Sequence, residues 1–123
     1  MPRSNWLASG GASEIDAAAD AARAAVDGEW GRLTATERGR LMLRFSTLVL
    51  AQVDRLAWIE AHDTGKPISQ ARADIRAVAR YFEFYGGAAD KIHGEVIPYL
   101  NGYNVTVVRE PLGVTAHIIP WNY

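Results

Sequence analysis

Apolar residues recur at helical spacing over most of the first ninety residues, and the first such stretch is rich in alanine. Ser13 and Asp16 place a hydroxyl and a carboxylate three residues apart, as an N-terminal helix cap requires, and the apolar stripe then continues to Gly28. We therefore expect residues 1–12 to form an irregular lead-in and a first helix to run from Ser13 to Gly28.

A second capping signal, Thr34 followed three residues later by Glu37, precedes the longest apolar stripe of the chain. The stripe keeps helical spacing from Leu41 to Ile59 without an internal proline, so it predicts one long helix. Gly39, near its start, is a mild cost to that helix because glycine is a poor helix former.

Residues typical of a helix end separate this stretch from a third predicted helix. Gly65 suits a left-handed C-terminal cap, and Pro67 suits the start of the next helix. From Ile68 to Tyr85 the apolar residues alternate steps of three and four, which predicts a third helix that Gly86-Gly87 closes or loosens.

The pattern changes to one typical of strands beyond residue 91. Residues 94–123 contain only three charged side chains, and β-branched and aromatic residues replace alanine and arginine. Segments 95–98 and 103–109 flank a turn that contains Asn101-Gly102, which predicts a β-hairpin. Pro98 confines its strand to a sheet edge, because proline cannot donate to the ladder.

The run 114–119 is short and nearly continuously apolar, as expected of a strand buried on both faces of a parallel sheet. Such a strand needs neighbouring strands and a crossover of a dozen or more residues, and no such segment follows residue 119. The expected fold class is therefore α/β, with N-terminal helices, a hairpin and one strand of an incomplete parallel sheet.

Composition narrows the function classes. The 123 residues are 49% hydrophobic and carry a net charge of −1, so no long-range field attracts nucleic acid or an anionic membrane. The spaced arginines of the third helix are best interpreted as a solvated face. They are Arg72, Arg76 and Arg80. No window is apolar enough for a membrane span and the N-terminus has no signal-peptide core, so the cytoplasm is the expected compartment.

The chain contains no cysteine, which excludes disulfides, cysteine-ligated metals and a thiolate nucleophile within these residues. His93-Gly94-Glu95 has the His-x-Glu form of zinc deaminases, but that chemistry requires a cysteine pair, so we expect no metal and interpret Gly94 as a turn at the hairpin entry. The G-x-G-x-x-G dinucleotide fingerprint is also absent.

The end of the 114–119 run is the strongest candidate for a site. Asn122 follows a dry strand and Pro120, and α/β proteins place ligands at the carboxyl ends of such strands. Two interpretations remain open on spacing alone: the Asn122 amide stabilises an oxyanion, or it starts a turn or caps the next helix.

Five motifs in order resemble the N-terminal part of the NAD(P)-dependent aldehyde dehydrogenases, and the match runs from about Ile15 to Tyr123. The motifs are Arg38 with Leu41 in a long helix, Asp63-Thr64-Gly65-Lys66-Pro67, Ala89-Asp90-Lys91-Ile92-His93-Gly94-Glu95-Val96-Ile97-Pro98, Arg109-Glu110-Pro111-Leu112-Gly113-Val114, and Ile118-Ile119-Pro120-Trp121-Asn122.

The resemblance implies a role for each part. Residues 13–90 frame one side of a cofactor-binding domain, residues 91–112 form a hairpin of the oligomerisation type, and residues 113–123 hold the first strand of a Rossmann-like core. Homo-oligomers then associate through residues 91–110. Ile118, Ile119, Pro120 and Trp121 line the cleft for NAD or NADP, and Asn122 helps to hold the oxyanion of a thiohemiacetal. Family members bind the dinucleotide without G-x-G-x-x-G.

In the family, a cysteine attacks the aldehyde and a glutamate activates water, and both lie beyond the Pro-Trp-Asn motif. A chain that lacks this cysteine is expected to be inactive by itself. The alternative is a catalytically dead truncated chain that acts, if at all, as a strand-pairing interaction module.

Overall fold

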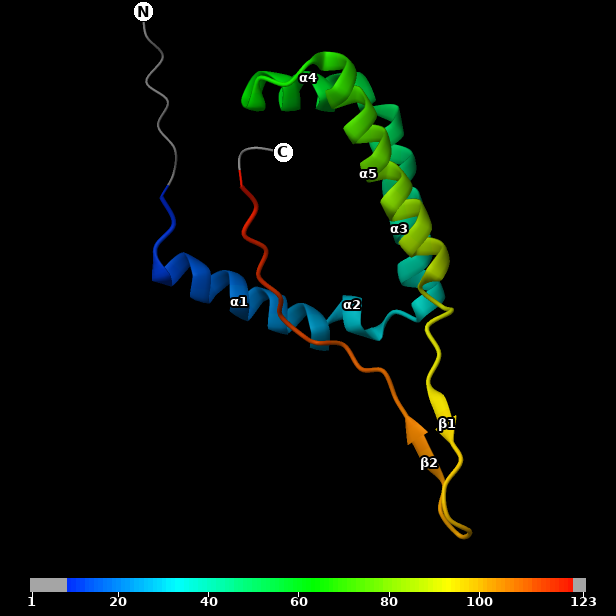
Figure 1. The fold of residues 1–123 in the computed structure, drawn as a ribbon. Helices are drawn as coiled ribbons and strands as arrows, with labels where there is room; N and C mark the ends of the chain where they lie inside the picture. The colour runs from blue at the N-terminus through cyan, green and yellow to red at the C-terminus, as the bar shows by residue number, and fades with distance from the viewer. Residues whose placement is uncertain (1–8, 121–123) are drawn as a thin grey trace, which may run out of the picture. The chain divides into compact units, whose positions relative to one another are not determined.

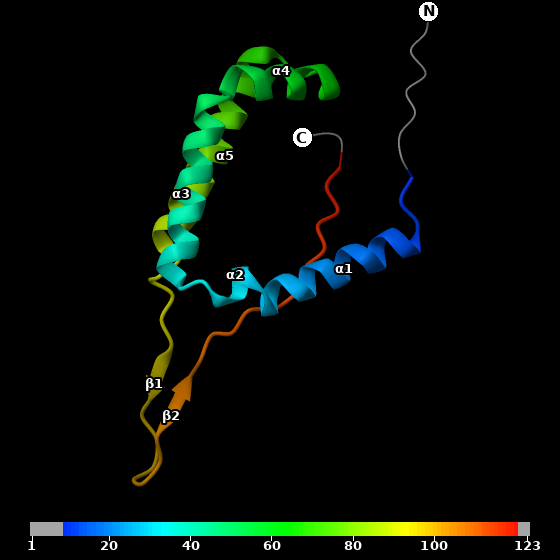
Figure 2. The same cartoon turned by 180° about the vertical axis from the view of Figure 1, so that it is seen from behind.

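The computed structural model describes residues 9–120, which divide into two compact units that are treated separately below. The first unit holds residues up to Arg32 together with Leu112–Ala116. The second holds Leu33–Pro111 and the residues from His117 onward. Figures 1 and 2 show the elements in chain order.

In the first unit, helix α1 (Ala12–Asp27) begins one residue before the predicted start. Gly11 is its N-cap, and the Gly11 backbone N–H donates to Glu14 Oε2 at 2.7 Å, so the stabilising carboxylate is Glu14 rather than Asp16. Gly28 ends the helix as predicted. A short helix α2 (Glu29–Arg32) follows that the sequence pattern did not predict.

In the second unit, the Thr34 capping box is confirmed. The Glu37 backbone N–H donates to Thr34 Oγ1 at 3.2 Å, and the Thr34 N–H donates back to Glu37 Oε2 at 2.7 Å. These bonds satisfy two amides that have no partner inside the helix, and they start helix α3 (Ala35–Ala51) at the expected place.

The prediction of one long helix was wrong, because the stretch is broken at Gln52 into α3 and α4 (Val53–Thr64). The Gln52 N–H donates to the carbonyl of Val49, three residues earlier, whereas an α-helix pairs residues four apart. Neither glycine nor proline occurs near this position to break the helix. Beyond the break, Val53 and Ala57 on α4 are buried, and α4 packs mainly against α5. Tertiary packing therefore sets this bend.

Helix α5 (Ile68–Ala88) lies alongside α3, and both views show α4 at one end of the pair (Figures 1 and 2). Gly86-Gly87, predicted to close or loosen this helix, lie inside its last turn, and the helix ends one residue later at Ala88. Gly86 is buried, and a Cβ atom on Gly39 would lie only 2.5 Å from the Gly86 carbonyl oxygen. The two glycines let the helix backbones touch, which explains why both are tolerated inside helices.

The core of this helical unit consists mainly of small residues. Ser46 Oγ donates to the Ala79 carbonyl oxygen at 2.7 Å across the interface between α3 and α5. Phe45 and Phe82 meet edge to face with ring centroids 4.5 Å apart. The buried apolar residues are Val49, Val53, Ala57, Ala71 and Ala79.

The predicted hairpin is confirmed, with shorter strands than expected. Strands β1 (Glu95–Ile97) and β2 (Val105–Val107) pair antiparallel, with Val96 opposite Thr106. The Tyr103 N–H donates to the Leu100 carbonyl across the turn, and Gly102 there has a φ of 88°, which favours glycine.

The strand predicted for residues 114–119 is absent, since residues 108–120 have no regular secondary structure. A strand exists only through hydrogen bonds to a neighbouring strand, and the sheet of residues 9–120 contains only β1 and β2. None of the helices among these residues is both long and apolar enough to cross a bilayer.

Candidate functional site

The predicted cofactor-lining residues belong to the chain that leaves the hairpin. Ile118 is 98% exposed and Ile119 is 81% exposed, and Pro120 beside them is exposed as well. Trp121 and Asn122 lie outside the described residues. The described half of the predicted site is therefore a row of uncovered apolar side chains.

Arg109 fixes the base of the hairpin, where this segment begins. Its Nε donates to the His93 carbonyl oxygen at 3.0 Å, and its Nη2 lies 3.6 Å from Glu95 Oε1. Gly94 stands between these partners, and a Cβ there would come within 2.3 Å of the Val107 carbonyl oxygen. Gly94 is thus required by the close approach of β2 and not by a turn.

The His93-Gly94-Glu95 motif is accounted for by this hairpin contact. Both Glu95 and the His93 carbonyl face Arg109, a cation that competes with any metal for the same oxygen atoms. Within residues 9–120, no three histidine or acidic side chains gather in a group that could hold a metal ion.

The Asp63 to Pro67 motif forms the elbow between α4 and α5, as its stop signals predicted. Gly65 has a φ of 77° and its N–H donates to the Ala61 carbonyl at 2.9 Å, which completes a left-handed cap. Thr64 Oγ1 donates to the Glu60 carbonyl at 2.8 Å and accepts a long bond from the Lys66 N–H.

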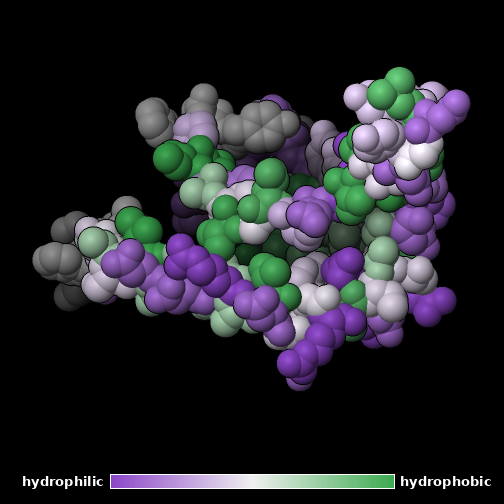
Figure 3. Space-filling view, turned by 90° about the horizontal axis from the view of Figure 1, so that it is seen from below, coloured by the Kyte–Doolittle hydropathy of each residue, from purple (hydrophilic) through white to green (hydrophobic). Residues whose placement is uncertain are grey.

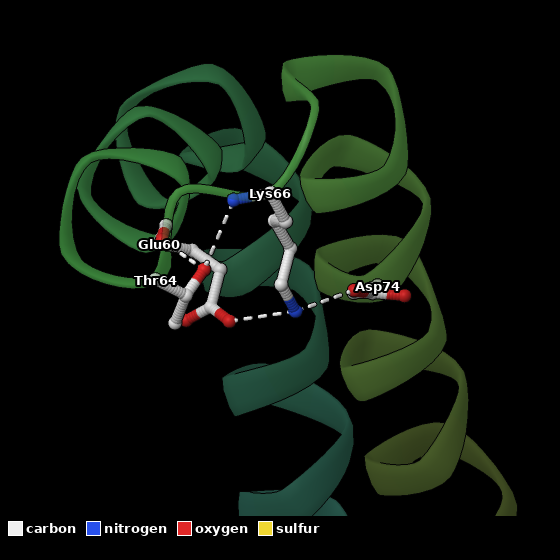
Figure 4. A network of polar contacts seen from close by, with 4 residues as sticks. All are labelled: Glu60, Thr64, Lys66 and Asp74. Carbon is white, nitrogen blue, oxygen red and sulfur yellow. Dashed lines mark hydrogen bonds and ion pairs between the residues drawn. The ribbon is translucent and has the colours of Figure 1, made fainter. Parts of the chain in front are cut away.

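Lys66 adds a polar contact that the sequence did not predict (Figure 4). Its ammonium lies 2.8 Å from Glu60 Oε1 on α4 and 2.9 Å from Asp74 Oδ2 on α5, and the side chain is only 12% exposed. Hydrogen bonds to Glu60 and then to Asp74 raise the pKa of Lys66. The residue joins the two helices at their elbow, and only the tertiary structure reveals its partners.

The arginines of α5 behave as a solvated face. Arg72 Nε donates to Asp54 Oδ1 at 2.8 Å, and Arg80 lies 3.1 Å from Glu83. These ion pairs are exposed, so each contributes little to stability. The charges of Arg72 and Arg80 are matched locally, which does not favour a phosphate-binding track along this helix.

A sequence profile described as the aldehyde dehydrogenase family matches residues 5–123. The mitochondrial aldehyde dehydrogenase family 2 member B4 of Arabidopsis thaliana is 46% identical over 119 residues, which are 95% of this chain and 22% of that protein. The chain therefore spans about a quarter of the length of the relatives that it matches.

Solved structures agree over the same region. The crystal structure of a Burkholderia cenocepacia protein described as an aldehyde dehydrogenase matches with a TM-score of 0.92 and 59% identity, over 95% of this chain and 25% of that one. An NAD-dependent aldehyde dehydrogenase from Sinorhizobium meliloti matches with a TM-score of 0.68 and 39% identity, over 71% of this chain and 18% of that one.

Proposed function

Because the chain belongs to the aldehyde dehydrogenase family, we propose that it forms the N-terminal part of an NAD(P)-dependent enzyme that oxidises an aldehyde to a carboxylic acid. The observation that carries the proposal is the match along nearly the whole chain to proteins about four times as long. The aldehyde itself is specified by parts of those proteins that this chain does not contain.

In the complete protein, residues 114–119 form the first strand of a Rossmann-like sheet. Supporting this, the segment is nearly continuously apolar, and Ile118 and Ile119 at its end are exposed. Burial of the exposed Ile118 by the rest of the protein is favourable, because transfer of an apolar side chain out of water lowers the free energy.

The residues after this strand fit a dinucleotide. Ile118, Ile119, Pro120 and Trp121 supply an apolar wall against which a flat ring can lie, and the first two are exposed in this chain. Bound NAD or NADP supplies the hydride acceptor of the reaction. The wall's contribution is to orient the dinucleotide and to exclude water from the reacting carbon.

Asn122 acts on the aldehyde oxygen. When the sulfur of a cysteine beyond residue 123 bonds to the aldehyde carbon, the carbonyl π electrons move onto oxygen as an oxyanion. The Asn122 side-chain N–H donates to that oxygen, an interaction worth about 2.7–4 kcal/mol in a comparable role. A glutamate, also beyond residue 123, activates the water that releases the acid.

The test is Asn122→Ala in the complete enzyme. We expect kcat to fall about 10²–10³-fold, with little change in the Kd for NAD, because the amide contacts the oxyanion and not the cofactor. Gln70→Ala, which removes a side-chain amide at an exposed position of α5, is the matched control and leaves kcat unchanged. An unaltered kcat in Asn122→Ala removes this residue from the mechanism.

The 123-residue chain by itself has no cysteine and is inactive in this proposal. Oxidation of an aldehyde by the purified chain with NAD, followed as NADH absorbance, contradicts it. The complete enzyme works in the cytoplasm in the same proposal, and its location can be checked with a fluorescent fusion.

Residues 91–110 associate the subunits of the complete enzyme. Supporting this, Val96 is 75% exposed and Val108 is 71% exposed on a hairpin whose two outer edges pair with no strand of residues 9–120. Val96→Asp is expected to dissociate the oligomer in sedimentation experiments. If the isolated 123-residue chain instead forms a defined complex through this hairpin, the strand-pairing module is the better function.

A further inference from the structure

The turn of the hairpin carries the only asparagine–glycine pair in the sequence. Its four residues run from Leu100 to Tyr103, and the Tyr103 N–H donates to the Leu100 carbonyl oxygen at 3.2 Å. Gly102 has a φ of 88°, and among residues 9–120 only glycines have a positive φ. Asn101 and Gly102 therefore hold the two central positions of a turn with the pattern of type II. Figure 1 shows this turn where the chain passes from β1 to β2.

Water reaches both residues of the pair. Asn101 and Gly102 are exposed, and a Cβ atom on Gly102 would have no atom within 4 Å. The bond that closes the turn is the only backbone hydrogen bond that joins two of residues 98–104. The Gly102 N–H has no acceptor in the described part of the chain. The backbone nitrogen of Gly102 is therefore open to reaction, and a single hydrogen bond restrains the turn.

An asparagine that precedes glycine loses its side-chain amide by an intramolecular reaction, which proximity favours. The Gly102 backbone nitrogen gives up its proton to water and bonds to the side-chain carbon Cγ of Asn101. The bond from Cγ to the amide nitrogen breaks, that nitrogen leaves as ammonia, and a cyclic succinimide remains. Water then adds to one of the two carbonyl carbons of the ring. Opening at Cγ yields aspartate, and opening at the backbone carbon yields isoaspartate, whose main chain runs through Cβ and Cγ.

Asn104 in the same hairpin supplies a comparison. It is exposed as well, but the nitrogen that would attack its side chain belongs to Val105. Val105 lies in β2, is paired with Ile97 in the ladder and is partly buried. Its branched side chain crowds the backbone nitrogen and restricts the main chain, whereas Gly102 has no side chain. The hairpin therefore favours the reaction at Asn101 over the one at Asn104.

We propose that Asn101 is a site of spontaneous deamidation, at which the turn of the hairpin acquires a negative charge as the protein ages. Residues 96–108 contain no charged side chain, so the product carboxylate is the first charge in this stretch. In sequence it falls between Tyr99 and Tyr103, two exposed residues whose ring centroids are 5.8 Å apart. The reaction consumes only water and releases ammonia, and it does not depend on the proposed function.

The test is peptide mapping of the complete protein during incubation in mildly alkaline buffer. Trypsin cleaves after Lys91 and Arg109 and releases peptide 92–109, which contains both asparagines. This peptide is expected to gain the mass that separates a carboxylate from an amide, and fragmentation assigns the gain to one residue. Asn101 should react at least about tenfold faster than Asn104, which corresponds to about 1.4 kcal/mol in activation free energy. No gain at Asn101, or equal rates at the two residues, overturns the proposal.

The chemical form of the product gives a second readout. Hydrolysis of a succinimide yields isoaspartate as well as aspartate, so an isoaspartate-specific methyltransferase is expected to methylate the aged peptide 92–109. Hydrolysis of the amide by direct attack of water yields aspartate alone. A mass gain at Asn101 without any methylation therefore overturns the attack by the Gly102 nitrogen.

Two matched variants test the assignment to Asn101. Asn101→Gln keeps an amide but adds a methylene group, so the attack would have to form a larger and less favoured ring, and the mass gain of peptide 92–109 is expected to disappear. Asn104→Gln makes the same change at the other exposed asparagine of the hairpin and is expected to leave the gain intact. Equal effects of the two variants overturn the proposal. The readout is a mass, so its failure is distinguishable from a failure of aldehyde oxidation.

Discussion

The helices α3 to α5 and the residues from the hairpin onward differ in how they satisfy their backbones and bury their side chains. In the helical part, Ala57 and Ala71 are completely buried and Ala79 is 1% exposed. In the hairpin and the segment after it, only Val105 is even partly buried, and Leu112 is 95% exposed. Both parts contain many apolar residues, yet only the helices bury apolar side chains completely.

The reason is the sequence separation between the residues that share a backbone hydrogen bond. A helix pairs its N–H and C=O groups within four residues, so three helices can form and pack with nothing but a short elbow between them. A strand pairs only with another strand, which for residues 114–119 has to come from elsewhere. Many large hydrophobic side chains are exposed. Figure 3 shows hydrophobic residues among hydrophilic ones on one face of the molecule.

The largest expected effect comes from charging the segment that lacks a strand partner. Val114→Asp should destabilise the complete protein by about 4 kcal/mol or more, because an unpaired carboxylate is then placed in a buried strand. In the 123-residue chain it should leave the far-ultraviolet helix signal unchanged. The two measurements are the unfolding free energy of the complete protein and the far-ultraviolet helix signal of the 123-residue chain. An unchanged unfolding free energy, or a changed helix signal, contradicts the difference between the helices and the segment after the hairpin.

Two adjacent glycines of α5, Gly86 and Gly87, test the close contact between α3 and α5. Gly86→Ala places a Cβ 2.9 Å from the Gly39 carbonyl oxygen and should lower the free energy of unfolding by about 1–3 kcal/mol, as overpacking does. Gly87→Ala meets no atom within 4 Å and should raise it by up to about 1 kcal/mol through helix propensity. Urea unfolding measures both, and effects of the same sign contradict the backbone contact.

Removal of a single hydrogen bond at the interface between α3 and α5 is expected to have a smaller effect. Ser46→Ala removes the donor to the Ala79 carbonyl oxygen and should cost about 1 kcal/mol of unfolding free energy. Thr47→Ala, next to it, removes an exposed hydroxyl that bonds to Leu43 on the same helix and should cost less. Equal losses in urea unfolding contradict a special role for the buried bond.

The smallest effect is a pH dependence at the start of α3. The Thr34 backbone N–H and then its hydroxyl hold the pKa of Glu37 below its ordinary value of 4.5. Glu37 therefore stabilises the fold fully above that value, and the contribution is lost as the pH falls through the lowered pKa. Glu37→Gln should flatten the loss of stability below pH 4.5 in acid titrations of Tm, and an unchanged acid titration contradicts this role of Glu37.

Local chemistry explains which predictions were confirmed. The capping box at Thr34, the left-handed cap at Gly65 and the turn at Gly102 each involve residues within a few positions of one another. Short-range rules therefore suffice to place them. The family motifs could likewise be recognised from the sequence, because most of them are contiguous runs of residues.

What the sequence by itself determined was the order of three helical stretches and a hairpin, with the family to which they belong. Only the tertiary structure decided the bend at Gln52, the glycine contact between α3 and α5 and the ion pairs of Lys66 with Glu60 and Asp74. Each of these depends on which surfaces meet, and a one-dimensional pattern does not contain that information. The same physics leaves residues 114–119 without a strand, because β structure is a property of pairs of segments and never of one alone.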